Sequence, residues 1–273
     1  MFSVLIANYN NGHYIEEALD SVFEQTYSNW EVIIVDDGST DKSGEVLKKY
    51  EEFEQIHIYY NKKNKGCGFT KRKCVEKANG EICGFLDPDD VLDPEALKIM
   101  VESHKENSGS GLIYSTYYGC NERLEPQFIP DWVGEFQRGE TQLTASRISA
   151  LATFKLSAYL KTEGINPSFR RAVDQDLYFK LEEVTDTKFV DKPLYYYRKH
   201  TNGISTFENR YKAKYWHLMA GFDACDRRGI DKEEYFSEFL KRHNKEIYLG
   251  DSKEYKLGRV LLKPLRKIHE WVK

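Results

Sequence analysis

The sequence lacks the signatures of several classes of protein. It has five cysteines, an odd number, and no two of them form a C-x-x-C pair. Neither a disulfide framework nor a zinc knuckle is therefore indicated, and a reducing cytoplasm is the expected compartment. No signal-like segment opens the chain, and no apolar run reaches the length of a membrane-spanning helix. The formal net charge is only −4, which argues against a general nucleic-acid-binding protein.

The composition is that of a globular protein. The 273 residues are 40% hydrophobic and 14% aromatic, with 19 tyrosines, unlike those of a disordered chain. This length allows one large α/β domain, alone or with a helical appendage. The protein is expected to be soluble or peripherally attached to a membrane.

Apolar runs alternate with helical patterns in the N-terminal third of the chain. Almost continuous apolar runs predict strands at residues 3–8, 31–36, 56–60 and 82–86, and apolar residues between them recur at helical spacing. Continuously apolar strands are typical of a sheet that helices cover on both faces. The alternation predicts a Rossmann-like, mostly parallel α/β sheet with ligands at the carboxyl ends of its strands.

Polar residues follow each of these predicted strands. In strand order they are Asn8 and Tyr9, then Asp37, then Lys71 and Arg72, then Asp87 and Asp89. An aromatic ring, a carboxylate, cations and an acidic cluster are what a nucleoside diphosphate requires for its base and its phosphates. Each residue alone also fits an ordinary role, such as a helix cap or a core aromatic. Their convergence at successive strand ends favours a nucleotide-binding crevice.

The fourth strand ends in three carboxylates, Asp87, Asp89 and Asp90. Like charges at this spacing repel one another, so a cation or water must screen them. Oxygen ligands suit Mg²⁺ or Mn²⁺, ions that commonly serve phosphates. A solvated acidic turn before the next helix is the alternative, because Asp is common in turns.

Three motifs together resemble the family 2 glycosyltransferases, whose fold is called GT-A. They are Ile6-Ala-Asn-Tyr-Asn10, Val35-Asp-Asp-Gly-Ser-Thr-Asp41 and Phe85-Leu-Asp-Pro-Asp-Asp90. The resemblance implies inverting transfer of a sugar, expected to be UDP-linked, to a glycan or polyprenyl-linked acceptor in surface polysaccharide synthesis. It also implies an enzyme of the hexosyltransferase type.

The resemblance covers roughly residues 1–205 and implies a division of the chain. Residues 1–92 form the expected nucleotide-sugar-binding half of a GT-A domain, and residues 93–205 form its acceptor and catalytic half. Residues 206–273, which are rich in helical patterns, form a C-terminal helical extension. The aromatic segment 120–142 matches a region that faces the acceptor in the family; its Trp132 is either a sugar-stacking residue or a buried hinge aromatic.

The resemblance also assigns roles at the ends of the first strands. Ala7 and Tyr9 would border the base, and Asp37 would hydrogen-bond it. Asp87 would reach the ribose or the metal, and Asp89 would ligate a Mn²⁺ or Mg²⁺ ion that bridges the two phosphates.

One part of the pattern departs from the family. Where the family usually has Ala-Arg-Asn after the glycine-rich turn, this chain has Thr70-Lys71-Arg72. Lys71 and Arg72 are therefore both candidates for the cation at the nucleotide, and their contacts stay open.

The general base is expected at the start of a later helix. Inverting transfer needs a group that takes the proton of the acceptor hydroxyl, and the family places an Asp there in a Glu-Asp-x-Asp pattern. The matching residue is Asp174, with Asp176 as the second Asp; helix capping is the structural alternative for both. Val173 replaces the usual Glu, so an assisting carboxylate is missing.

A second family pattern, Tyr-Arg-x-His, matches Tyr197 to His200. His200 would ligate the metal or bind the diphosphate. Arg198, at the end of the same strand, is as well explained as an ion-pair partner in the wall of the site.

The C-terminal part of the chain has no catalytic pattern. Tyr211, Tyr215, Leu218, Met219 and Phe222 predict an amphipathic helix that ends at Gly229. Residues 253–273 carry seven basic and two acidic residues among leucines and a tryptophan, a pattern typical of a helix on anionic lipid. This segment predicts peripheral contact with the inner face of the cell membrane; a helix docked on its own domain is the alternative.

Two functional hypotheses of different classes remain. The first is a metal-dependent inverting glycosyltransferase, and the second is a catalytically silent relative that binds a nucleotide as a binding module, which Val173 suggests. A nucleotidyltransferase is less well supported, because Asn8 to Asn11 does not form the glycine-rich loop expected after its first strand.

Overall fold

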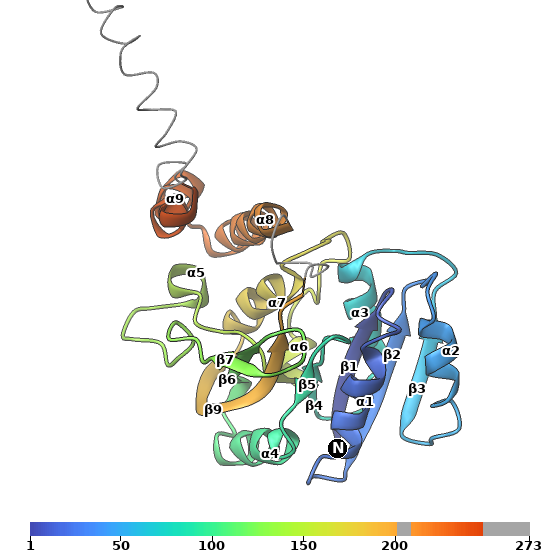
Figure 1. Ribbon diagram of the computed structural model, residues 1–273. Helices are drawn as coiled ribbons and strands as arrows, with labels where there is room; N and C mark the ends of the chain where they lie inside the picture. The colour runs from blue at the N-terminus through green and yellow to red at the C-terminus, as the bar shows by residue number, and fades with distance from the viewer. Residues whose placement is uncertain (201–208, 248–273) are drawn as a thin grey trace, which may run out of the picture. The chain divides into compact units, whose positions relative to one another are not determined.

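The computed structural model describes residues 1–200 and 209–247 of the chain (Figure 1). It contains two compact units, Met1–Ala224 and Cys225–Lys273. The predicted domain boundary at residue 205 and the predicted lipid-binding segment 253–273 lie outside the described residues and stay predictions. No helix of the described part combines the length and apolar character needed to cross a bilayer.

The N-terminal strands form the parallel half of the sheet. They are β1 (Phe2–Asn8), β2 (Trp30–Asp36), β3 (Ile56–Tyr60) and β4 (Ile82–Phe85), in the order β3-β2-β1-β4. The helices between them are α1 (Ile15–Phe23), α2 (Ser43–Lys48) and α3 (Cys67–Lys77). This order reverses direction at β1, so the ends of β1, β2 and β4 border one crevice.

Burial explains why the predicted strands form where they do. Consecutive residues of a strand point to opposite faces of the sheet. Leu5 and Ile6 in β1 are both completely buried, and so are Ile33 and Ile34 in β2. Both faces of the sheet are therefore covered. In α1, Ile15, Ala18, Leu19 and Val22 are buried at helical spacing.

The second half of the described sheet is mixed. Its strands are β5 (Val91–Leu92), β6 (Ser110–Cys120), β7 (Pro126–Phe128), β8 (Ala152–Lys155) and β9 (Asp186–Arg198). β8 pairs antiparallel with β4 and with β6, whereas β6 and β9 are parallel. The short β5 directly follows the acidic turn and pairs antiparallel with the end of β9. This pairing brings the turn at Asp87–Asp90 next to Arg198 and His200.

The helices of this half are α4 (Ala96–Glu106), α5 (Gln142–Ala145), α6 (Leu156–Tyr159) and α7 (Val173–Glu182). Helix α4 begins at Ala96, directly after a turn at residues 93–95. In this turn the side-chain Oδ1 of Asp93 accepts from the Glu95 N–H at 3.0 Å.

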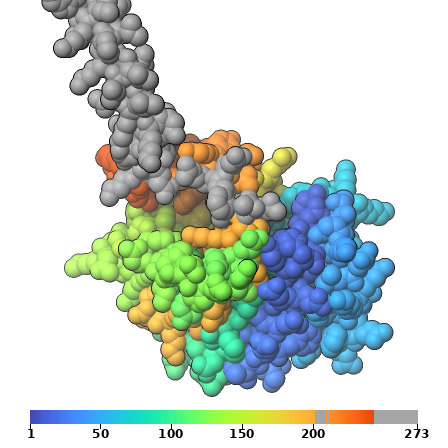
Figure 2. Space-filling view, in the orientation of Figure 1, coloured from blue at the N-terminus to red at the C-terminus, as the bar shows by residue number. Residues whose placement is uncertain are grey.

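The segment after β6 lies on the surface beside the N-terminal segment, as green next to blue in Figure 2. Tyr14 reaches it with a hydroxyl that donates to Glu122 at 3.4 Å. Trp132 is 45% exposed, so it is not a buried hinge aromatic, and it contacts Tyr117 edge-on.

The helical C-terminal prediction is confirmed for the described residues. Helix α8 (Arg210–Arg228) is followed directly by Gly229, whose φ of 64° suits glycine. Helix α9 (Lys232–Ile247) follows. The α/β class with a central sheet flanked by helices is confirmed as well.

Candidate active site

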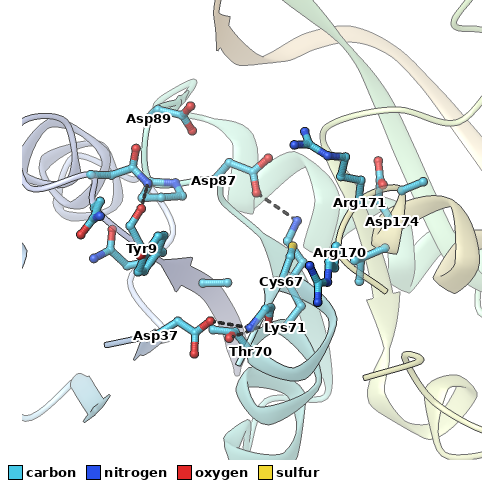
Figure 3. A pocket seen from close by; sticks show the side chains of 18 of the residues that line it. Tyr9, Asp37, Cys67, Thr70, Lys71, Asp87, Asp89, Arg170, Arg171 and Asp174 are labelled. Atoms are coloured by element: carbon cyan, nitrogen blue, oxygen red, sulfur yellow. Dashed lines mark hydrogen bonds and ion pairs between the residues drawn. The ribbon is translucent and has the colours of Figure 1, made fainter. Parts of the chain in front are cut away.

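A cavity of about 1590 Å³ opens at the carboxyl ends of β1, β2 and β4 (Figure 3). It brings together every residue proposed from the sequence for the site except one. Those that line it are Ala7, Tyr9, Asp37, Lys71, Asp87, Asp89, Asp174 and His200. The predicted convergence of strand ends therefore occurs.

Arg72 does not line the cavity. Its Nε donates to Glu76 Oε1 at 3.0 Å, and its Nη1 donates to the carbonyls of Ile165 at 3.2 Å and Glu163 at 3.4 Å. Neighbouring residues on a helix point about 100° apart, so Lys71 faces the cavity while Arg72 faces the segment at 163–165. Of the two candidate cations, Lys71 is the one that can meet a ligand in this cavity.

Asp37 is buried at the end of β2 and fixes the loop after β3. Its carboxylate accepts from Asn61 Nδ2 at 2.8 Å, from the Lys65 N–H at 2.9 Å and from the Gly66 N–H at 2.8 Å. Tyr9, in contrast, is 43% exposed at the cavity. If the N–H of a nucleotide base also donated to Asp37, the carboxylate would accept from the base and from this loop at the same time.

The three carboxylates of the acidic turn have three different partners. Lys71 Nζ donates to Asp87 Oδ1 at 3.0 Å, and His200 Nε2 lies 2.8 Å from Asp89 Oδ2. Asp90 Oδ1 accepts from the Arg198 N–H at 2.7 Å. Burial, with the charges of Asp89 and Asp87, raises the pKa of Asp90 well above its ordinary value. Asp90 therefore supports the turn from inside and does not reach the cavity.

Asp89 and His200 could form part of a divalent-cation site whose remaining ligands come from a bound substrate. They bring a carboxylate oxygen and an imidazole nitrogen to one point of the cavity wall. Within the described residues, no group of three or more His, Cys, Asp or Glu side chains is placed to hold a metal. Mg²⁺ and Mn²⁺ commonly complete such sparse sites with phosphate oxygens and water.

Arg198 is an ion-pair partner in the wall of the site, as the sequence suggested. Its buried guanidinium donates to Glu17 Oε2 at 2.7 Å, to the Asp89 carbonyl at 2.7 Å and to the Glu122 carbonyl at 2.6 Å. It also lies over the Tyr14 ring, 4.6 Å from its centroid. These bonds hold the backbone of the acidic turn in place.

Asp174 and Asp176 both lie in the first turn of α7, yet their surroundings differ. Asp174 is exposed to the cavity, whereas Asp176 is completely buried. Desolvation by the cavity wall raises the pKa of the Asp174 carboxyl above its ordinary value, although the Lys71 ammonium opposes this shift. Asp174 is thus the carboxylate of this pair that a ligand can reach.

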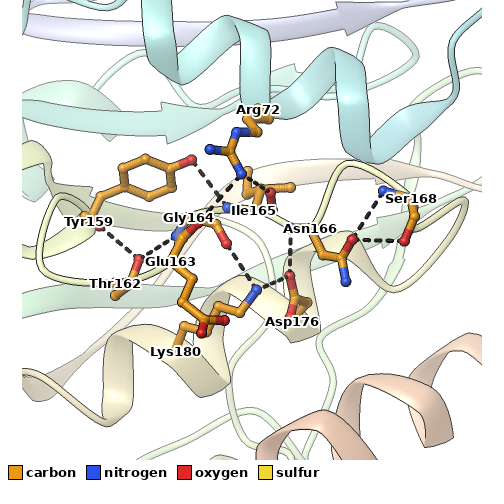
Figure 4. A network of polar contacts seen from close by, with 10 residues as sticks. All are labelled: Arg72, Tyr159, Thr162, Glu163, Gly164, Ile165, Asn166, Ser168, Asp176 and Lys180. Carbon is orange, nitrogen blue, oxygen red and sulfur yellow. Dashed lines mark hydrogen bonds and ion pairs between the residues drawn. The ribbon is translucent and has the colours of Figure 1, made fainter.

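Asp176 belongs to a polar network that fixes the segment before α7 (Figure 4). Its Oδ2 accepts from Lys180 Nζ at 2.9 Å and from the Asn166 N–H at 3.0 Å, and Lys180 Nζ also donates to the Gly164 carbonyl at 2.9 Å. Arg72 holds the same segment from α3. The segment 163–169 is therefore fixed between the helix that carries Lys71 and the helix that carries Asp174.

The sequence pattern missed one wall of the cavity. Its residues come from the segment before α7 and from α8, and they are Ser168, Arg170, Arg171, Tyr211, Lys212, Tyr215 and Trp216. Tyr211 and Tyr215 were predicted on the apolar face of their helix, but they are 54% and 57% exposed. Periodicity does not reveal this exposure, which puts both rings at the surface of the cavity.

The comparisons with known proteins decide the family. A model described as "Glycosyl transferase family 2" matches residues 3–161. The chain belongs to this family. It is 30% identical over 236 residues to a chondroitin synthase of Escherichia coli, covering 86% of this chain and 34% of that protein. It is also 30% identical over 238 residues to a hyaluronan synthase of Pasteurella multocida, covering 86% of this chain and 24% of that protein.

The chain thus spans about a quarter to a third of the length of these curated relatives. Two solved structures show the same GT-A fold. Residues 1–349 of S. aureus TarS, in complex with UDP-GlcNAc, match with a TM-score of 0.71 and 24% identity, covering 90% of this chain and 73% of that one. A mannosyltransferase of Pyrobaculum calidifontis, in complex with GDP-Man and Mn²⁺, matches with a TM-score of 0.62 and 15% identity, covering 97% and 82%.

Proposed function

We propose that this family 2 chain is a metal-dependent, inverting glycosyltransferase that uses a UDP-linked sugar and acts on a glycan or lipid-linked glycan in surface polysaccharide synthesis. The observation that carries the proposal is that Tyr9, Lys71, Asp89 and Asp174 line the same cavity. Relatives named for chondroitin and hyaluronan synthesis support a polysaccharide product. The TarS complex with UDP-GlcNAc supports a UDP-linked donor.

The donor's nucleotide is assigned to the wall at β1, β2 and α3. The exposed ring of Tyr9 and the backbone of Ala7 border the base, and Asp37 presents its carboxylate and the loop that it fixes. Lys71 is paired with Asp87 at 3.0 Å, so the two side chains offer a cation for phosphate and an acceptor for a ribose hydroxyl. Arg72 acts outside this site, on the segment 163–165.

Asp89 and His200 would hold Mn²⁺ or Mg²⁺ together with the donor's diphosphate. When bound, such an ion neutralises negative charge on the diphosphate as the sugar leaves it. The Mn²⁺ in the Pyrobaculum calidifontis mannosyltransferase supports this assignment. Arg198 keeps Asp89 in place by its bond to the Asp89 carbonyl.

Asp174 is the proposed general base. It takes the proton of the acceptor hydroxyl while that oxygen bonds to the anomeric carbon and the bond from this carbon to the diphosphate breaks. Attack from the side opposite the diphosphate inverts the anomeric configuration. The raised pKa of Asp174 strengthens it as a base, and the nearby Lys71 opposes its protonation.

Donor hydrolysis tests this proposal without knowledge of the acceptor. The protein is incubated in Mn²⁺ with UDP-GlcNAc, UDP-glucose, UDP-glucuronate or GDP-mannose, and nucleotide release and nucleotide-dependent thermal shift are both measured. We expect slow release from at least one UDP-sugar, with an inverted sugar product by NMR. A UDP-dependent shift without release from any donor would instead indicate a catalytically silent binding module, which the buried Val173 in place of the family's Glu would explain.

A further inference from the structure

The cavity wall at α7 and α8 combines cations with exposed aromatic rings. Arg170 and Arg171 lie on the Asp174 side of the cavity, away from Tyr9 and Asp89 (Figure 3). Lys212 adds a third positive charge to this wall. We call Arg170, Arg171, Tyr211, Lys212 and Tyr215 the basic aromatic wall.

The charges of this wall differ from those of the donor side. There, Asp87 is paired with Lys71 and Asp89 contacts His200. Arg170 is exposed and has no hydrogen-bond or ion-pair partner among residues 1–200 and 209–247. Arg171 is half-buried and donates to Asn209 Oδ1 at 3.2 Å, which fixes its direction. The wall therefore offers positive charge to a ligand.

The two tyrosines add a surface for a sugar ring. Tyr211 and Tyr215 are four residues apart on α8, so they share one face of the helix. A tyrosine ring offers a flat apolar face together with a polar hydroxyl. The C–H face of a pyranose can pack on such a ring while its hydroxyls stay hydrated.

We propose that the basic aromatic wall binds a sugar unit of the acceptor that carries an anionic group, a carboxylate or a phosphate. This inference rests on the proposed function and names the class of its acceptor. The planar guanidinium group of Arg170 matches either anion with paired hydrogen bonds, and Arg171 and Lys212 add positive charge to the same wall. The same segment leads directly into Asp174, the residue assigned to the acceptor's proton. The wall thus adjoins the residue assigned to the acceptor.

The test is a binding experiment that needs no turnover. Three tetrasaccharides that differ only in their terminal unit, glucose, glucuronate or glucose 6-phosphate, are titrated calorimetrically into the full chain in the presence of UDP. We expect at least one acidic ligand to bind about 10- to 100-fold more tightly than the neutral one, the range for charge-assisted hydrogen bonds. The tighter of the two acidic ligands identifies the anionic group.

Two variants locate the effect. Arg170→Met should remove the preference for the acidic ligand, whereas Lys98→Met, which removes a charge from an exposed side chain of α4 outside the cavity, should keep it. Equal binding of the three ligands to the unchanged chain overturns the inference. Loss of UDP binding in Arg170→Met, with the acidic preference intact, also overturns it and assigns the arginine to the donor. Failure of donor hydrolysis in the unchanged chain contradicts the proposed function instead.

Discussion

The buried pair Asp176–Lys180 allows a prediction whose size follows from the structure. The two side chains are 0% and 5% exposed and lie 2.9 Å apart. Lys180→Met fills a similar volume but leaves the Asp176 carboxylate without its charge partner in the interior. Removing one partner of a buried pair typically costs about 3–5 kcal/mol. For a chain of this size, about 1 kcal/mol corresponds to a Tm change of about 2–4 °C, so we expect a loss of about 6–20 °C.

Two further variants separate the buried charge from a simple packing effect. Asp176→Asn combined with Lys180→Met removes both charges, so it should be less destabilising than Lys180→Met alone. Lys49→Met breaks an exposed pair with Glu16 and should cost less than about 1 kcal/mol. Calorimetric melting of the four proteins measures these differences. A Lys180→Met loss no larger than that of Lys49→Met would refute the reasoning.

Three other predictions concern the acidic turn, the base and the C-terminal segment. Asp89→Asn should weaken the Mn²⁺-dependent binding of a UDP-sugar, which calorimetry measures, but should leave the Tm within a few degrees because Asp89 lies at the cavity. Unchanged turnover in this variant would exclude Asp89 as a metal ligand. Lys71→Met removes the cation that lowers the pKa of Asp174, so the acid limb of kcat/KM should move to higher pH, and a limb that stays in place would exclude this influence. Truncation after Asp251 should abolish co-sedimentation with anionic vesicles, which added salt should also weaken for the full chain; vesicle binding that survives truncation would contradict the lipid-binding prediction.

The N-terminal half of the fold could be predicted because its signal is local. Strands that are buried on both faces, such as β1 and β2, must be apolar throughout, and parallel strands present their carboxyl ends at one edge. Tyr9, Asp37 and Asp87 could therefore be placed together from their order in the chain alone.

What could not be predicted depends on partners distant in sequence. Lys71 and Arg72 are adjacent, and their separation into cavity and scaffold follows from the carbonyl of Ile165, to which Arg72 donates. Asp174 and Asp176 differ because Lys180 and the segment at Asn166 enclose the latter. A periodic pattern records which residues share a helix face, but it does not record what that face contacts.

The exposed tyrosines of α8 illustrate the same limit. Helical spacing placed Tyr211 and Tyr215 with Leu218 and Phe222 on one apolar face, yet the two tyrosines line the cavity. Aromatic residues serve both cores and binding surfaces. Neither helical spacing nor residue type could therefore show which aromatic residues of this helix pack in the interior and which line the cavity.

The most direct test of the proposed chemistry is Asp174→Asn in the full chain, assayed with a UDP-sugar that the unchanged chain hydrolyses. The substitution keeps the size and polarity of the side chain but removes the proton acceptor. Turnover should fall by about 10²- to 10⁴-fold, the contribution typical of a general base, while the Kd for UDP stays the same. Turnover that persists in Asp174→Asn would contradict the assignment of this carboxylate as the base.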